Sequence, residues 1–282
     1  MDHIILEQAP ELEDPALVVA FRGWNDAGDA ASVALETLRT QWHARRFAHI
    51  DPEEFYDFQV TRPMVELIEG TTRRIDWPQL TFSHVRVGGR DVVLALGTEP
   101  NLKWKTYARE VIGFARDLGV RRIITLGAFL ADVAHTREVP IVGTAPSPDE
   151  AERLGLAPSR YQGPTGIVGV LADTANRTGL PTVSLWAASP HYVSSSENPK
   201  AALALIERIG QLLEVTVDVS DLVPAAQAWE DSIDEQVRQN QALVDYISGL
   251  EEADDELVAM EETDADGLAE EIERFLEQRG DG

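Results

Sequence analysis

The sequence predicts an α/β protein: a mixed, mostly parallel sheet with helices on both faces, followed by an acidic helical extension at the C-terminus. Three observations support this fold class. Short apolar runs alternate with helical periods along most of the 282 residues, which is typical of a parallel sheet covered on both sides. The segment 51–90 contains strand-like runs with no helix long enough between them, so the sheet should be mixed. From about residue 220 the composition becomes acidic and helical.

The individual elements follow from local pattern. Five apolar runs are predicted strands: 16–21, 91–97, 121–129, 139–145 and 181–187. Five segments have helical character: 29–42, 103–118, 147–155, 166–179 and 198–213. Three further strands are expected within the irregular segment: 55–60, 71–77 and 81–87. Gly88 and Gly89 can supply the positive φ angles of a tight turn, so they predict a hairpin.

The C-terminal part has its own apolar pattern. Spacings of three, four and seven place one apolar stripe on a helix: Trp229, Ile233, Val237, Val244 and Ile247. Burying such a stripe requires contact with the body or with another subunit. Two shorter helices are expected over 251–262 and 264–278. We therefore predict two units, an α/β core at 1–219 and an acidic helical segment at 220–282.

Charge and composition exclude several classes of function. The net charge is −25, and residues 224–282 alone carry 19 Asp and Glu against 3 Arg, a net of −16. An acidic surface repels phosphate backbones, so no nucleic-acid partner is expected. The tail serves either solubility or recognition of a basic partner. No apolar run is long enough to span a bilayer, and there is neither a signal peptide nor a cysteine, so a cytoplasmic protein is expected.

The unusual loops follow strands. In a parallel sheet the carboxyl ends of the strands share one edge, where ligands bind. The candidate ligand- or partner-binding residues in these loops are Trp24, Asn25, Asp26, Glu99, His135, Arg137, Tyr161, Thr165, His191 and Tyr192. Asp26 and Asp29 are also good N-cap candidates for the helix that follows, and both histidines can be structural.

Motifs for familiar chemistries are missing from the sequence. It contains no G-x-S-x-G, G-x-G-x-x-G, H-E-x-x-H or Walker motif, so no catalytic residue and no cofactor is assigned. The stretch "ETDADGLAEEIE" (262–273) approaches a calcium loop, but Glu262 replaces the usual first Asp and a helical stripe continues through it. No metal site is therefore expected.

A set of motifs resembles the bacterial branch of the proteasome assembly chaperone family. The motifs are "FRGWNDAGDAAS" (21–32), "WPQL" (77–80), "LGTEPNLKW" (96–104), "LGAFLADVAHTREVPIVG" (126–143), "YQGPTGIVGVL" (161–171) and "SLWAASPHYVSSSENPKAALALI" (184–206). The resemblance covers about residues 4–220. It implies an α/β fold of the nucleoside phosphorylase or hydrolase kind, a homo-oligomer, and relatives that help to assemble proteasome core particles. Chaperones that dock into α-ring pockets end in a hydrophobic-Tyr-any tripeptide, whereas this chain ends in Gly280-Asp281-Gly282.

Two functions are therefore weighed. The first is a non-enzymatic homo-oligomer that acts through protein–protein contacts and has proteasome subunits or another protein as partner. The loop aromatics Trp24, Trp104 and Tyr192 support self-association. The second is an enzyme or small-molecule binder that uses the strand-end loops. Convergence of Asp26, Glu99, His135 and His191 on one roomy pocket would favour the second.

Overall fold

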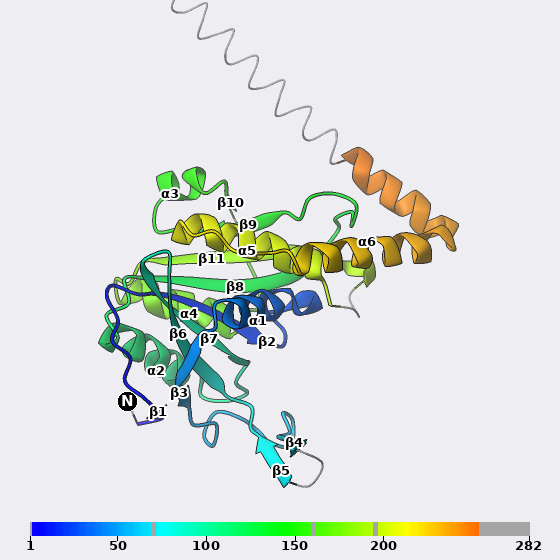
Figure 1. Cartoon of the computed structure of the whole chain (residues 1–282). Helices are drawn as coiled ribbons and strands as arrows, with labels where there is room; N and C mark the ends of the chain where they lie inside the picture. Colours follow the sequence, from blue (N-terminus) through cyan, green and yellow to red (C-terminus); the bar gives the residue numbers. More distant parts are fainter. Residues whose placement is uncertain (1, 69–71, 159–161, 194–196, 254–282) are drawn as a thin grey trace, which may run out of the picture.

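The computed structural model describes residues 2–68, 72–158, 162–193 and 197–253, and its centre is a nine-stranded sheet (Figure 1). The spatial order of the strands is β1-β3-β6-β7-β2-β8-β11-β9-β10. Their bounds are β1 Ile4–Leu6, β2 Ala16–Arg22, β3 Arg45–Ile50, β6 Leu80–Val87, β7 Arg90–Thr98, β8 Arg122–Ala131, β9 Ile141–Thr144, β10 Ala157–Pro158 and β11 Thr182–Pro190. A separate two-stranded sheet pairs β4 (Met64–Ile68) with β5 (Thr72–Asp76).

The centre of the large sheet is parallel and its flanks are mainly antiparallel, which confirms the predicted mixed sheet. β7, β2, β8 and β11 all run in the same direction. β1, β3 and β6 continue the sheet beyond β7 through antiparallel pairs, and β9 is antiparallel to β11. The carboxyl ends of the four central strands therefore lie at one edge, and the loops that follow them start there.

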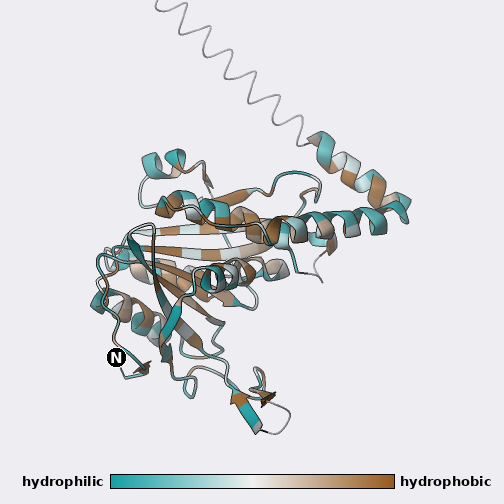
Figure 2. Ribbon diagram, viewed as in Figure 1, coloured by the Kyte–Doolittle hydropathy of each residue, from teal (hydrophilic) through white to brown (hydrophobic). Residues whose placement is uncertain are grey.

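Helices cover both faces of the sheet. α1 (Ala30–Gln41) and α5 (Pro199–Leu213) pack together on one face, and α2 (Trp104–Asp117) and α4 (Ile167–Arg177) pack together on the other. The side chains of β2 alternate between the two cores: Val18 lies in the α1/α5 core, whereas Leu17 and Val19 lie in the α2/α4 core. Strands buried on both faces in this way are largely apolar, and the central strands of Figure 2 are mostly brown with pale segments between.

The predicted elements of the alternating region are present, and the irregular segment holds the differences. Gly88 (φ 57°) and Gly89 (φ 81°) form the turn between β6 and β7. The strand predicted over 55–60 is wrong, because these residues form turns. Phe55 and Tyr56 are consecutive and both buried, and the Phe55 carbonyl accepts the N–H groups of two residues in the loop after β7. Packing around that loop replaces strand pairing.

The C-terminal segment begins with α6 (Leu222–Arg238), and a second helical stretch covers residues 241–253. α6 packs on α5. Ile233, Val237 and Ile247 are buried in one cluster with Ala134 of the body, so the predicted stripe does dock, although a turn at 239–240 divides it into two helices. The helices expected beyond residue 253 lie outside the described residues. The division into 1–219 and 220–282 stays a prediction.

Three further elements complete the described part: the short α3 (Pro148–Arg153) and two 3-10 turns, Ala27–Asp29 after β2 and His191–Val193 after β11. None of the helices in the described residues has the length and apolar character needed to cross a membrane.

Candidate functional site

The loop between β2 and α1 is held by the Asp26 carboxylate, which caps α1. Its Oδ1 accepts the backbone N–H of Ala31 at 2.7 Å, and its two oxygens accept that of Ser32 at 3.3 and 3.2 Å. These N–H groups belong to the first turn of α1, where no helical carbonyl is available to them. The Asp29 side chain makes no capping bond. Of the two caps that the sequence offers, Asp26 is the one used.

Burial changes the acidity of this cap. Asp26 is only 5% exposed, and loss of hydration raises the pKa of its carboxyl from 3.8 to about 6, although the hydrogen bonds from Ser32 and Ala31 act in the opposite direction. A carboxylate that loses hydration is destabilised more than the neutral acid. Near neutral pH the ionised Asp26 therefore lowers the free energy of unfolding relative to an uncharged hydrogen-bond acceptor at the same position.

Three strand-end loops are joined through Asn25 and Glu99. Glu99, at the end of β7, accepts the Asn25 side-chain amide and the Ile167 backbone N–H at its Oε1, each at 2.8 Å. It thereby caps α4, as Asp26 caps α1. The second glycine of the stretch "GPTG", Gly166, packs against Asn25. Any larger residue would place its Cβ 1.9 Å from Asn25 Oδ1. The motif makes room for Asn25.

A second group of loop residues anchors the C-terminal helices. His135 is 2% exposed. The Tyr192 hydroxyl lies 2.8 Å from both the His135 backbone nitrogen and its Nδ1, and His135 Nε2 lies 3.0 Å from Asp234 of α6. Because the hydroxyl oxygen accepts the backbone N–H, its proton is available to Nδ1, and Nε2–H can donate to Asp234. Burial raises the pKa of Tyr192 to about 12.

The neighbours of His135 extend this anchor. The Thr136 hydroxyl donates to a Glu251 carboxylate oxygen, and Arg137 lies 3.5 Å from the Glu251 carbonyl. Tyr246 donates to Asp132 at 3.0 Å, and His191 lies 3.2 Å from the same carboxylate. Residues 135–137 and 191–192, which lie within two of the motifs quoted above, thus help to hold residues 222–253 against the body. No local pattern indicates these contacts, because the partners are ordinary acidic residues and a tyrosine on a distant helix.

The convergence on one pocket that would favour an enzyme or a small-molecule binder is not seen for Asp26, Glu99, His135 and His191. Asp26 and Glu99 cap two helices. His135 instead contacts Asp234 of α6, and His191 contacts Asp132, the residue that also binds Tyr246. Thr165 is exposed, and Tyr161 lies outside the described residues. Trp104 and Tyr192 are half-buried and hydrogen-bonded within the chain. Trp24 differs from them, because it is 65% exposed.

A cavity of about 910 Å³ nevertheless lies between α4, the loop after β2, the C-terminal part of β8, β9 and the first half of β11. Its wall is largely apolar and aromatic, with polar groups at a few positions; we call it the strand-end cavity. Its principal lining residues are Trp24, Asp26, Phe129, Leu130, Val142, Thr165, Ser184 and Trp186. Gly127 admits the Trp186 ring, because a Cβ there would lie 2.5 Å from it. Of the predicted residues, Trp24, Asp26 and Thr165 line this cavity.

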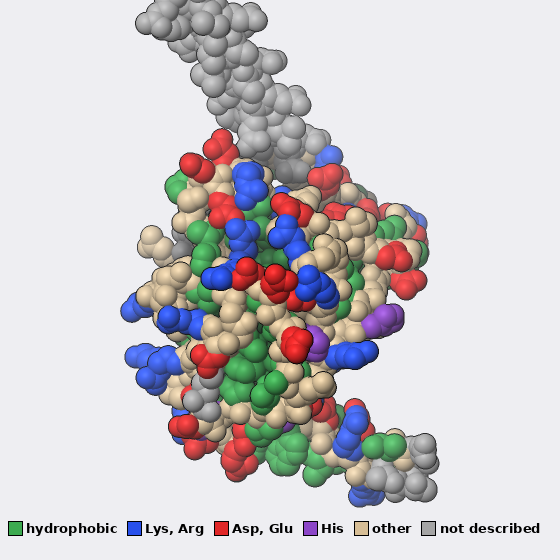
Figure 3. Space-filling model, turned by 60° about the vertical axis from the view of Figure 1, so that its left-hand side comes forward, with side chains coloured by type: hydrophobic (Ala, Val, Ile, Leu, Met, Phe, Trp, Pro, Cys, Tyr) green, Lys and Arg blue, Asp and Glu red, His purple; other side chains and the backbone are tan. Residues whose placement is uncertain are grey.

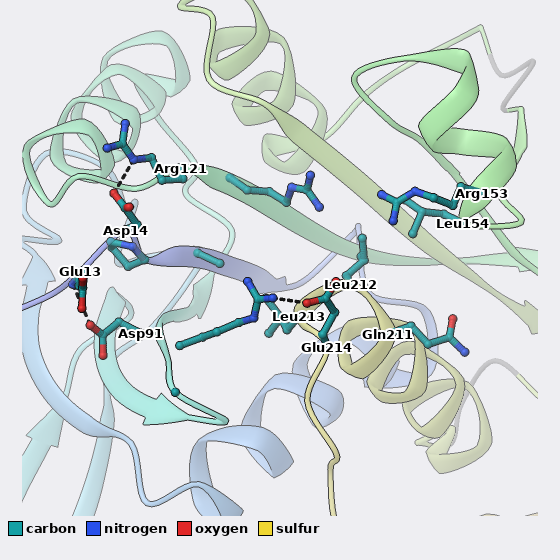
Figure 4. Close-up of a pocket in the computed structure, with 15 residues that line it drawn as sticks. Glu13, Asp14, Asp91, Arg121, Arg153, Leu154, Gln211, Leu212, Leu213 and Glu214 are labelled. Carbon is teal, nitrogen blue, oxygen red and sulfur yellow. Dashed lines mark hydrogen bonds and ion pairs between the residues drawn. The ribbon is translucent and has the colours of Figure 1, made fainter.

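The opposite edge of the sheet has a polar hollow of about 620 Å³. Arginines and acidic residues are interspersed on the face of Figure 3, and within the hollow Arg121 and Asp14 point toward one another, 2.6 Å apart (Figure 4). Arg90 pairs with Glu214, and Arg122 with Glu150 at 2.8 Å. These arginines are balanced by carboxylates of the chain itself, so the hollow carries no strong excess of positive charge.

The fold is that of a known family. The chain belongs to the PAC2 family, whose model matches residues 20–237, and this confirms the family that the motifs predicted. A PAC2 family protein from Streptomyces avermitilis is 47% identical, with a TM-score of 0.77 over 83% of this chain and 99% of that one. The Mycobacterium tuberculosis proteasome-assembly chaperone homologue Rv2125 is 45% identical, with a TM-score of 0.76 over 82% and 99%.

A more distant relative covers more of the chain. The M. tuberculosis protein of unknown function Rv2714 is 27% identical, with a TM-score of 0.84 over 93% of this chain and 92% of that one. No functionally curated protein matches the sequence.

Proposed function

We propose that the chain is a non-enzymatic, homo-oligomeric chaperone of the proteasome-assembly type, which acts in the cytoplasm by binding proteasome subunits. We favour binding over catalysis because the polar side chains of the loops are hydrogen-bonded to other parts of the fold. Asp26 and Glu99 satisfy helix N-termini, and His135 joins Tyr192 to Asp234. A catalytic pair needs a nucleophile or base directed at a site for substrate; these side chains instead have partners within the fold.

The class of partner is supported by the relatives. A proteasome-assembly chaperone homologue is 45% identical to this chain over 99% of its own length. At that identity and coverage the surfaces, and not only the fold, are expected to be related. A subunit of the proteasome is therefore the first partner to test.

The docked tail supplies a contact surface for such a partner. α6 turns its apolar side toward the body, while Asp231 and Glu235 are exposed one helical turn apart on its outer side. The whole segment 224–282 has a net charge of −16. A surface of this kind attracts a basic partner surface, and the attraction weakens as salt screens it.

The test is co-expression of the full chain with the proteasome α and β subunits of its own organism, followed by affinity capture and native mass spectrometry. We expect a complex with α subunits that weakens between about 0.05 and 0.3 M salt. The variant Asp231→Asn/Glu235→Gln should bind less tightly. Asp149→Asn/Glu152→Gln is the matched control, because it removes the same charges from exposed positions of α3. Failure to capture any proteasome subunit at low salt would overturn the proposal.

The strand-end cavity favours a second candidate function, binding of a small molecule. Its volume of about 910 Å³ falls within the roughly 300–1,000 Å³ of ligand pockets, and its apolar wall has few polar groups, as such pockets do. Native and denaturing mass spectra of the purified chain test this candidate. A mass difference of a few hundred daltons, removed by Leu130→Trp, would support it, and equal masses would count against it.

A further inference from the structure

The strand-end cavity is open because α4 presents small residues to it. Gly169 and Ala172 are the residues of α4 that line the cavity. A hydrogen atom and a methyl group cannot fill the space between the helix and strands β8, β9 and β11, so a volume of about 910 Å³ remains. Ligand pockets have volumes of roughly 300–1,000 Å³, so the cavity is large enough for a molecule with a ring system.

Trp186 forms a fixed aromatic wall of this cavity. Its indole N–H donates to the Ser184 hydroxyl oxygen at 3.0 Å, and that oxygen lies 2.9 Å from the buried Thr125 hydroxyl oxygen. The ring also lies against Gly127, its partner in the parallel register of β11 and β8. A ring held on two sides loses little conformational freedom when a ligand packs on it, which favours binding.

Two further aromatic side chains line the cavity. Phe129 belongs to β8, and Trp24 follows β2 and is 65% exposed. Aromatic side chains pack with flat rings in offset-stacked or edge-to-face arrangements. Their faces also attract cations, and tryptophan does so most strongly. The wall therefore suits a molecule that combines a flat ring with a positive charge.

The charged groups of the cavity are acidic. Among the lining residues that the structure describes, the charged side chains are those of Asp26 and Asp29, and there is no lysine, arginine or histidine. Asp26 is buried and holds the first turn of α1. Asp29 is exposed and makes no capping bond, so its carboxylate is accessible to the N–H group of a ligand.

The two helix N-termini beside the cavity also disfavour an anion. A helix N-terminus is a common anion site, because its free N–H groups carry partial positive charge. Here the N-terminus of α1 holds the Asp26 carboxylate, and that of α4 holds the Glu99 carboxylate through the Ile167 N–H at 2.8 Å. A bound anion would thus meet negative charge, whereas a cation meets complementary charge. The net charge of −25 acts in the same direction.

We propose that the strand-end cavity binds a flat aromatic molecule with a protonated amine, whose ring packs on Trp186 and whose ammonium group lies beside Asp26 and Asp29. The inference rests on the second candidate function above, the binding of a small molecule, and adds the charge and shape of the ligand. It is independent of proteasome binding, because the measurements below use the purified chain alone.

The first measurement is calorimetric titration of the full chain with tryptamine, tryptophol and indole-3-propionate. These probes share an indole ring and a two-carbon chain, and they end in an ammonium, a hydroxyl and a carboxylate group. We expect tryptamine to bind about tenfold more tightly than tryptophol, and indole-3-propionate to bind most weakly. Equal affinity for tryptamine and tryptophol, or no binding of tryptamine at millimolar concentration, would overturn the proposal. Either result is compatible with a co-purified ligand in native mass spectra, so it differs from a failure of small-molecule binding itself.

The second measurement places the ammonium group and the ring. Asp29→Asn should remove most of the preference for tryptamine and leave the affinity for tryptophol unchanged. Asp149→Asn is the matched control, because it removes an exposed carboxylate from α3, and it should keep both affinities. Trp24→Ala should weaken both probes about fivefold. Asp29 and Trp24 are exposed, so these variants should fold, and circular dichroism checks this. An undiminished preference for tryptamine in Asp29→Asn would overturn the proposed position of the amine.

Discussion

Replacing Asp26 by Asn removes a buried charge but keeps a hydrogen-bond acceptor at the start of α1. The carboxylate is 5% exposed, accepts the N–H groups of Ala31 and Ser32, and has its pKa raised from 3.8 to about 6 by burial. The folded chain therefore holds the proton more tightly than the unfolded chain does. The contribution of Asp26 to the free energy of unfolding is fully present below about pH 4, and it is lost as the pH rises through about 6.

The size of the effect follows from the shift in pKa. One unit corresponds to about 1.4 kcal/mol, so ionisation of Asp26 costs on the order of 3 kcal/mol in total. Because pH 5 lies about one unit below the folded-state pKa, about 1.4 kcal/mol of this is lost between pH 5 and pH 8. Asn does not ionise, and its amide oxygen can still accept the helix N–H. Asp26→Asn should therefore gain about 1.4 kcal/mol relative to wild type between these two pH values.

The assay is urea unfolding of both proteins at a fixed concentration from pH 5 to pH 8, above the pI of about 4.5. Asp26→Ala is the companion variant. It also loses the pH dependence, but without an acceptor it should lie about 0.5–2 kcal/mol below Asp26→Asn at every pH. A difference between wild type and Asp26→Asn that stays constant with pH would refute the buried-charge account. Equal stability of the Asn and Ala variants would refute the cap.

Two further predictions concern the contacts between loops. Gly166→Ala should destabilise the fold by roughly 1–3 kcal/mol, because its Cβ would meet Asn25 Oδ1; adding Asn25→Ala should recover part of this loss, and additive losses in a double-mutant cycle would contradict the contact. Tyr192→Phe should speed hydrogen exchange over residues 222–247 about tenfold, since the lost hydroxyl leaves the buried His135 N–H unpaired. Exchange in β8 and β11 should stay unchanged; no change in α6 would mean that Tyr192 does not anchor the tail.

The central strands could be predicted because burial on both faces leaves a continuous apolar run. β3 carries Arg45, Arg46 and His49, and its register shifts between Arg46 and Ala48, so it shows neither an apolar run nor regular alternation and was missed. β4 was missed as well. The strand predicted over 55–60 was wrong although its aromatic residues suit a strand. The Phe55 carbonyl is hydrogen-bonded by a loop about 45 residues away, and no local pattern reveals such a partner.

At the candidate site the sequence predicted the residues better than their partners. The Asp26 cap was predictable because its acceptor and donors lie within six residues. The Glu99 cap joins residues 68 positions apart, and the His135–Asp234 contact spans 99. Such pairs depend on how the sheet is ordered. The cavity residues Trp186 and Ser184 lie in a strand whose sequence is typical of a buried core strand. A local sign of the cavity is Gly127 in the neighbouring strand, which leaves room for the Trp186 ring.

The loop after β2 explains why a short connection contains so many large and polar residues. Gly23 adopts a φ of 128°, which a residue with a side chain rarely adopts, and this turns the chain at the end of the strand. Asn25 and Asp26 are buried: Asn25 donates to Glu99, which caps α4, and Asp26 caps α1. With both neighbours held in this way, Trp24 remains on the outside at the mouth of the strand-end cavity. The polar residues thus build a rigid base, and the indole is the part of the loop left free to meet a partner.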